Sequence, residues 1–154
     1  MEKESIIQRF KEKGLRLTRQ RLAIIDVLVA QGHLHPGVSF IYREAKKKNK
    51  SLSLSTTYAT INEFVRYGIM KALEFDGKEN RYEGNLDEHI NLICHRCEKI
   101  MDYRAPVYDH RTDVAETAGF VITGGRWEYY GYCKDCNLDQ QGAPSAGESP
   151  KSRS

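Results

Sequence analysis

The sequence lacks the features of a membrane protein or a secreted protein. None of its apolar runs approaches the roughly 20 residues that a membrane-spanning helix needs. Residues 1–5 include three charged side chains and no apolar stretch, unlike the start of a signal peptide. We therefore expect a cytoplasmic protein that makes no membrane contact.

The usual arrangements of a catalytic site are also missing. The sequence contains no glycine-rich phosphate loop, no Ser/His/Asp arrangement and no evident pair of catalytic carboxylates. We therefore expect that the protein is not an enzyme.

Cysteine is scarce, and every cysteine falls in a Cys-x-x-Cys pair. The four residues are Cys94, Cys97, Cys133 and Cys136, and 35 residues separate the two pairs. Two such pairs are typical of one tetrahedral zinc site with four sulfur ligands. A redox dithiol, a disulfide framework and a chance arrangement are the alternatives that the spacing leaves open.

Negative charge is in short supply in the first half of the chain. Residues 1–84 carry 16 Lys and Arg against 10 Asp and Glu, whereas residues 85–137 carry 6 against 9. This asymmetry favours two functional units, the first of which faces a polyanion. Charge alone fits an ordinary solvated surface equally well.

Apolar spacing in residues 1–84 predicts helices followed by a β-hairpin. The predicted elements are a helix that ends at Gly14, a helix from the N-cap Thr18 to about Gly32, a helix over about 38–48, a helix from the N-cap Ser55 to Tyr67, and strands over about 71–75 and 81–83 joined by a turn at 76–78. This order predicts a winged helix-turn-helix domain. A small helical bundle with an accessory hairpin is the alternative.

The fourth predicted helix has a small, uncharged outer face at its start. We expect its inner face to be Tyr58, Ile61, Phe64 and Val65, and its outer face to be Thr56, Thr57, Ala59, Thr60, Asn62 and Glu63. Such a surface suits a helix whose first turns enter a DNA major groove.

Residues 85–137 have a different pattern, which predicts a small α/β domain. The predicted elements are strands over 90–93 and 99–103, a helix from Pro106 to about Ala118, and strands over 120–123 and 127–132. Residues 138–154 show no apolar periodicity and predict a disordered tail. The predicted fold class is therefore α+β: a winged helix-turn-helix domain at 1–84, then a small α/β dimerisation domain with a Cys₄ zinc site at 85–137.

A second set of metal-binding residue types is spread over both predicted domains. It consists of His35, Glu83, His89, Asn91 and Asp102. Imidazole and carboxylate ligands together suit divalent transition metals such as Fe²⁺ and Mn²⁺. Spacing alone favours ordinary polar residues of the surface or core over a metal site.

Several motifs together resemble the ferric-uptake-regulator (Fur) family, over about residues 5–137. The motifs are Leu15-Arg16-Leu17-Thr18-Arg19-Gln20-Arg21, Leu34-His35-Pro36, Ser55-Thr56-Thr57-Tyr58, Asn80-Arg81-Tyr82-Glu83, the run from Glu88 to Asp102, and Tyr130-Gly131-Tyr132-Cys133. The resemblance implies a homodimeric, metal-responsive repressor that binds double-stranded DNA at an A/T-rich palindrome.

The resemblance also implies roles for individual residues. The four cysteines match the structural zinc ligands, and His35, Glu83, His89 and Asp102 match positions of a regulatory site for Fe²⁺ or Mn²⁺. Asn91 stands at a fifth position where the family usually has His, and an amide oxygen is a weaker ligand for a late transition metal. The implied DNA-binding residues are Arg16, Arg19, Arg21, Ser55, Thr56, Thr57, Tyr58 and Thr60.

Peroxide-sensing relatives in the family commonly have Asp at the position of Asp102, whereas iron-sensing relatives commonly have Glu there. In the peroxide-sensing branch, peroxide reacts at bound Fe²⁺ and a ligand histidine is oxidised; His35 and His89 match those histidines. We therefore expect a peroxide-sensing repressor, with an iron-responsive or other metal-uptake repressor as the alternative. A zinc-containing RNA-binding or scaffolding module and a redox enzyme are the rival classes.

Overall fold

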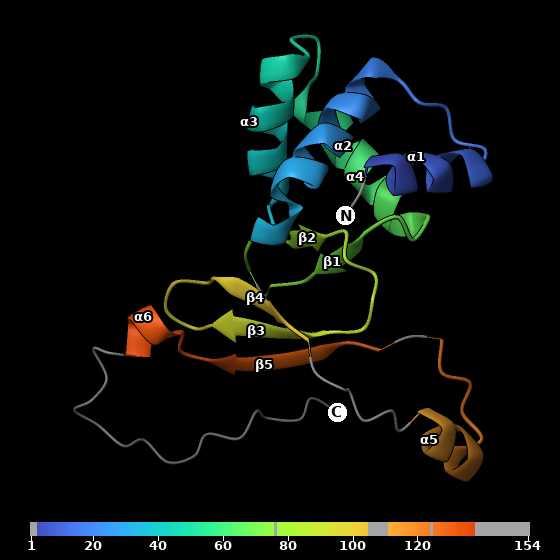
Figure 1. Ribbon diagram of the computed structural model, residues 1–154, viewed down its shortest axis with the longest axis vertical. Helices are drawn as coiled ribbons and strands as arrows, with labels where there is room; N and C mark the ends of the chain where they lie inside the picture. The colour runs from blue at the N-terminus through green and yellow to red at the C-terminus, as the bar shows by residue number, and fades with distance from the viewer. Residues whose placement is uncertain (1–2, 76, 105–110, 124, 138–154) are drawn as a thin grey trace. The chain divides into compact units, whose positions relative to one another are not determined.

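The computed structural model describes residues 3–75, 77–104, 111–123 and 125–137 (Figure 1). The chain divides into two compact units, Met1–Glu88 and His89–Ser154. Helices dominate the first unit and a three-stranded sheet the second, which confirms the predicted mixed α+β class. No helix among the described residues is both long and apolar enough to cross a membrane.

The first unit is a helical cluster followed by a short hairpin. Its elements are α1 (Lys3–Glu12), α2 (Arg19–Gln31), the 3₁₀ turn η1 (Gly32–Leu34), α3 (Val38–Lys48), α4 (Leu54–Arg66), β1 (Lys71–Leu73) and β2 (Arg81–Glu83). The strands β1 and β2 pair antiparallel. This is the predicted winged helix-turn-helix arrangement. The predicted turn between the strands includes Asp76, which lies outside the described residues.

The helices of the first unit pack around one apolar core. Phe10 of α1 and Phe64 of α4 meet edge to face, with 4.8 Å between their ring centroids. Ile24 of α2, Ile41 of α3 and Ile61 of α4 are also completely buried. Burying side chains of this size is the main stabilising contribution to such a fold, and it fixes α4 against the other helices.

The start and the face of α4 differ from the prediction. Its N-cap is Ser53, whose hydroxyl accepts a hydrogen bond from the Thr56 N–H at 3.0 Å, so Ser55 is not the cap. Thr57 and Thr60 are buried, at 0% and 6% exposure, and Tyr58 is 40% exposed. The prediction that both threonines face outward and Tyr58 inward is therefore wrong.

The physical reason is that a threonine can satisfy its own hydroxyl inside a helix. The Thr57 hydroxyl donates to the Ser53 carbonyl at 2.9 Å, which leaves its methyl group to pack in the core. Tyr58, with a polar end, takes the neighbouring exposed position instead.

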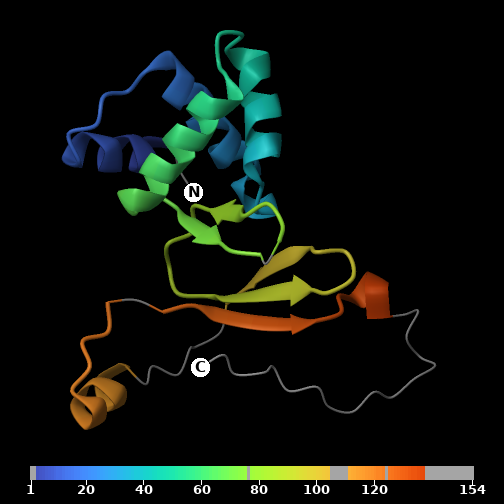
Figure 2. The same ribbon diagram turned by 180° about the vertical axis from the view of Figure 1, so that it is seen from behind.

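The second unit is a sheet in the order β4-β3-β5. Its elements are β3 (Ile90–Cys94), β4 (Ile100–Tyr103), α5 (Arg111–Ala118), β5 (Trp127–Gly131) and α6 (Lys134–Asn137). Figure 2 shows β3 between its two neighbours, antiparallel to β4 and parallel to β5.

One predicted strand of the second unit is absent from the described residues. Residues 120–123 form no strand, and Phe120 and Val121 are 63% and 83% exposed. An apolar, β-branched run forms a strand only where a neighbouring strand supplies hydrogen-bond partners, and none lies there among the residues described. The predicted helix start at Pro106 and the predicted tail at 138–154 lie outside the described residues.

A carboxylate from the hairpin caps the start of α3. The N-cap position is Gly37, which has no side chain to offer, and Glu79 Oε1 accepts the Ser39 N–H at 2.8 Å in its place. A Cβ atom on Gly37 would stand 2.1 Å from Glu79 Oε2. Glycine is therefore required for the carboxylate to approach.

Replacing Glu79 by Ala should lower the free energy of unfolding of the first unit by about 1 kcal/mol, because a capping acceptor is lost. Gly37→Ala should cost a similar amount by displacing the same carboxylate. Urea denaturation of the two single variants and the double variant measures both effects, with Glu74→Ala as a surface control. Full additivity of the two substitutions would contradict the shared cap.

Candidate metal centre and nucleic-acid interface

The four cysteines of the second unit converge at one end of its sheet. Cys94 ends β3 and Cys97 follows in the next turn, while Cys133 and Cys136 lie at the start of α6 and within it. Their Sγ atoms all lie within 4.8 Å of one another, and the sulfurs of Cys97 and Cys133 are 3.7 Å apart.

These distances fit a tetrahedral zinc site. Four sulfurs at about 2.3 Å from Zn²⁺ are separated by about 3.8 Å along each tetrahedral edge. A disulfide would need sulfurs about 2.05 Å apart, and all four cysteines are free thiols. The cluster therefore favours zinc over the disulfide that the spacing alone left open.

The backbone of each Cys-x-x-Cys turn directs its sulfurs toward the same point. The Glu98 N–H donates to the Cys94 carbonyl at 3.0 Å, and Glu98 adopts the left-handed conformation, with φ 59°. In the other turn the Cys136 N–H donates to the Cys133 carbonyl at 3.0 Å. The Cys133 N–H also reaches Cys94 Sγ at 3.3 Å, which joins the two turns directly.

The local environment favours ionisation of the Cys94 thiol and opposes ionisation of the Cys136 thiol. The backbone N–H groups of Cys133, Cys97 and Arg96 lower the pKa of the Cys94 thiol to about 6. Desolvation, followed by the neighbouring thiols, raises the pKa of Cys136 to about 12. Four thiolates this close together require a cation to balance their charge, and Zn²⁺ supplies it.

The first unit places two of the predicted regulatory ligands together. His35 and Glu83 are each 2% exposed, and His35 Nε2 lies 3.3 Å from Glu83 Oε2. His35 adopts a left-handed conformation, with φ 47°, and its backbone N–H donates to the Gly32 carbonyl at 3.0 Å. The Tyr82 N–H, next to Glu83, donates to the Pro36 carbonyl at 3.1 Å and so fixes the two side chains beside each other.

The second unit places the other three candidates around the same strand. Asn91 of β3 is directly opposite Asp102 of β4, so the two side chains share one face of the sheet. His89 is 5% exposed just before β3 begins, and Asn91 is 4% exposed. Glu128 of β5 pairs with Asn91 on the other side. No sequence pattern indicated Glu128, because only the parallel pairing of β5 with β3 brings it there.

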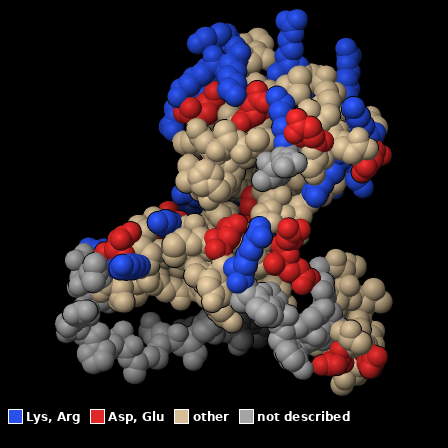
Figure 3. Space-filling model, in the orientation of Figure 1, with Lys and Arg blue, Asp and Glu red and all other residues tan. Residues whose placement is uncertain are grey.

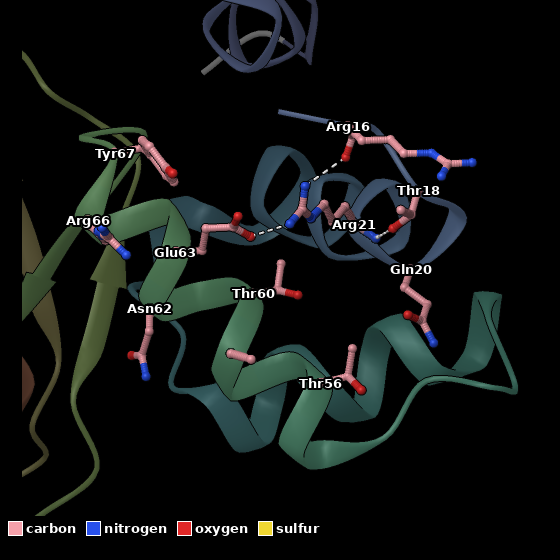
Figure 4. Close-up of a pocket in the computed structure, with 11 residues that line it drawn as sticks. Arg16, Thr18, Gln20, Arg21, Thr56, Thr60, Asn62, Glu63, Arg66 and Tyr67 are labelled. Carbon is pink, nitrogen blue, oxygen red and sulfur yellow. Dashed lines mark hydrogen bonds and ion pairs between the residues drawn. The ribbon is translucent and has the colours of Figure 1, made fainter. Parts of the chain in front are cut away.

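An open groove of about 730 Å³ lies between the start of α2 and α4 (Figure 4). Its lining residues are Arg16, Thr18, Gln20, Arg21, Thr56, Ala59, Thr60, Asn62, Glu63, Arg66 and Tyr67. Four predicted DNA-binding residues line this groove: Arg16, Arg21, Thr56 and Thr60. Thr60 is only 6% exposed. Gln20, Asn62, Glu63 and Arg66 were not predicted as DNA-binding residues.

The remaining predicted DNA-binding residues lie elsewhere on the first unit. Arg19 lines an adjacent groove with Lys48 and Lys50. Figure 3 shows many Lys and Arg side chains over the helical unit on the face that it draws. Ser55 and Tyr58 are exposed at the start of α4 and could face DNA. Thr57 is completely buried and cannot contact DNA in this conformation.

Replacing Cys133 by Ser should remove zinc and unfold the second unit, because structural zinc binding is coupled to folding. We expect one zinc per wild-type chain by elemental analysis and loss of β-sheet signal by circular dichroism in the variant. His95→Ala is the matched control, because exposed His95 lies in the same turn and stacks on Tyr130 without belonging to the cluster. Equal zinc loss in both variants would contradict the four-sulfur site.

Known proteins resemble this chain in sequence and in fold. The profile of the Ferric uptake regulator family matches residues 12–130. The peroxide-responsive repressor PerR of Staphylococcus epidermidis is 34% identical over 136 residues, 88% of this chain and 90% of that protein. The ferric uptake regulator Fur of Helicobacter pylori, whose structure is described as having three functional metal binding sites, is 25% identical, with a TM-score of 0.72 over 89% of this chain and 95% of that one. A zinc-bound manganese uptake regulator is 29% identical, with a TM-score of 0.62 over 83% and 98% of the two chains. This chain therefore belongs to the ferric uptake regulator family.

Proposed function

We propose that this protein is a homodimeric, metal-dependent repressor of transcription that binds an A/T-rich palindrome in double-stranded DNA. The observation that carries the proposal is the division of the ligand residues: His35 and Glu83 are side by side in the helical unit, whereas Asn91 and Asp102 face each other in the sheet unit. An ion that takes ligands from both units would restrict their relative orientation.

Two metal ions would have different tasks in this proposal. Zn²⁺ on Cys94, Cys97, Cys133 and Cys136 stabilises the sheet unit. Fe²⁺ or Mn²⁺ on His35, Glu83, His89, Asn91 and Asp102 regulates DNA binding. The nitrogen and oxygen donors of the second set suit these metals, because sulfur ligands would favour zinc instead. Metal that binds better to the DNA-competent arrangement shifts the population toward it.

DNA recognition would fall to the exposed start of α4 and to the groove beside it. Tyr58 contacts a thymine methyl group, and Ser55 and Thr56 contact phosphate or base edges. Arg16 reaches the minor groove of A/T-rich DNA, and Arg19 contacts phosphate. A two-fold dimer presents two α4 helices to half-sites about one DNA turn apart, and metal binding sets that separation.

The signal that we propose is peroxide. Similarity to PerR of S. epidermidis supports it, as do two buried histidines in the candidate ligand set. Fe²⁺ held by His35, Glu83, His89, Asn91 and Asp102 would supply the one-electron chemistry that activates hydrogen peroxide. Peroxide would be the two-electron oxidant: one of its oxygen atoms would be added to a histidine ring, and the other would leave as water. His35 and His89 are the two histidines of the proposed ligand set, so their rings are the ones that we expect to take up the oxygen, and an oxidised ring would be a poorer ligand. An iron-responsive repressor without this chemistry is the second candidate, supported by the similarity to Fur of H. pylori.

His89→Ala should abolish the metal dependence of DNA binding while the protein stays folded and dimeric. Fluorescence anisotropy with a DNA duplex selected from a random pool, with and without Mn²⁺, measures the effect. His33→Ala is the control, because His33 is exposed and close to His35 in sequence. Metal-independent binding by the wild type to every duplex would contradict the proposed function.

Peroxide treatment of the Fe²⁺-loaded protein should add the mass of one oxygen atom to a peptide that contains His35 or His89. Mass spectrometry of the digested protein locates the addition, and the Mn²⁺-loaded protein is the control that should stay unmodified. An unmodified Fe²⁺-loaded protein that keeps its DNA binding would favour the iron-responsive alternative.

A further inference from the structure

Arg21 is held from two directions in the groove between α2 and α4. Its Nη1 donates to the Arg16 carbonyl at 2.7 Å, and its Nη2 forms an ion pair with the Glu63 carboxylate of α4 (Figure 4). The side chains of Arg21 and Glu63 are 20% and 27% exposed, so the pair is partly shielded from water. The backbone N–H of Arg21 also donates to the N-cap hydroxyl of Thr18 at 3.2 Å.

These contacts change what Arg21 can do on DNA. A guanidinium whose planar donors already face a carboxylate is not available to a phosphate unless that ion pair breaks. The sequence predicted Arg21 as a phosphate contact, whereas the structure assigns it to positioning. It connects the Arg16 carbonyl, in the loop before α2, to Glu63 of α4.

Glu63 also lowers the positive charge of the groove. It is the one carboxylate among the described residues that line it. The other charged lining residues are Arg16, Arg21 and Arg66, and the first and last of these are exposed. A phosphate entering the groove meets two exposed arginines and the Arg21–Glu63 pair, whose charges cancel. The carboxylate therefore reduces the sequence-independent attraction that a groove with three arginines would have for any DNA.

We propose that Glu63 withholds Arg21 from phosphate and so lowers the affinity of this surface for DNA of any sequence, which leaves recognition of the operator to the base contacts. This inference rests on the proposed function, because it treats the groove as part of a DNA interface. Base contacts near Tyr58 distinguish the operator, and they do not involve Glu63. A phosphate contact acts alike on every sequence, so withholding it lowers both affinities by the same factor and makes the base contacts a larger share of the free energy of operator binding.

Glu63→Gln removes the charge and keeps a side chain of nearly the same shape. We expect it to tighten binding to a random-sequence duplex about three- to tenfold at low salt, and to steepen the dependence of log K on log[KCl] by about 0.9, as one further phosphate contact requires. Binding to an A/T-rich duplex selected by the Mn²⁺-loaded wild type should tighten by the same factor, so the ratio of the two affinities should stay at its wild-type value. Fluorescence anisotropy over a KCl series gives all three quantities.

Two further variants separate the proposal from a general change in charge. Glu44→Gln removes one carboxylate from an ion pair on α3 outside the groove, and it should leave the salt slope at the wild-type value. In the double variant Arg21→Gln/Glu63→Gln, the slope should return to that value, because the arginine released by the first change is gone. Thermal melts verify that each variant is folded.

The proposal is overturned if Glu63→Gln matches Glu44→Gln on the random duplex, or if it weakens binding to both duplexes. Failure of the proposed function would look different. In that case the Mn²⁺-loaded wild type would select no duplex over random DNA, while the salt slopes on random DNA would still report whether Glu63 restrains Arg21.

Discussion

The sheet unit depends on the convergence of four sulfur atoms. The apolar core cluster of the described residues lies entirely between Ile6 and Tyr82, in the helical unit. Among the described residues of the sheet unit, the buried apolar side chains are few: Ile90, Ile93 and Ile100, together with two of the cysteines. A core of this size provides little stability by burial alone. Zinc that joins the turn after β3 to the turn at α6 would hold the sheet, and with it the strand that carries Asn91.

The same small core leaves aromatic side chains uncovered on the sheet unit. Tyr103, Tyr129 and Tyr130 are all more than half exposed. Exposed aromatic residues in such a small unit are typical of a surface that another chain covers, which agrees with the dimers that proteins of this family form. Stability of the sheet unit would then come from two sources outside its own core, the metal and the second copy.

The helical unit combines a rigid core with an adjustable surface. Phe10 and Phe64 fix α4 in place, while the exposed face of that helix carries Tyr58 and the groove carries Glu63. Glu79 connects the hairpin to the start of α3, close to the buried pair His35 and Glu83. Two of the proposed ligand residues and the proposed DNA-facing residues therefore share one well-packed scaffold, in which a shift at His35 and Glu83 would not be absorbed by loose packing.

The sequence by itself determined the features that depend on local spacing: the paired cysteines, the helices followed by a hairpin, and the family. It misassigned Thr57 and Thr60, because helical periodicity identifies a stripe by its apolar members and does not reveal a hydroxyl that bonds to its own backbone. It predicted a strand over 120–123 from residue types alone, whereas a strand also needs a neighbour. Only the tertiary structure decided that Arg21 pairs with Glu63, 42 residues away, and that Glu128 lies beside Asn91. Such pairings depend on how helices pack and strands align, and no local pattern encodes them.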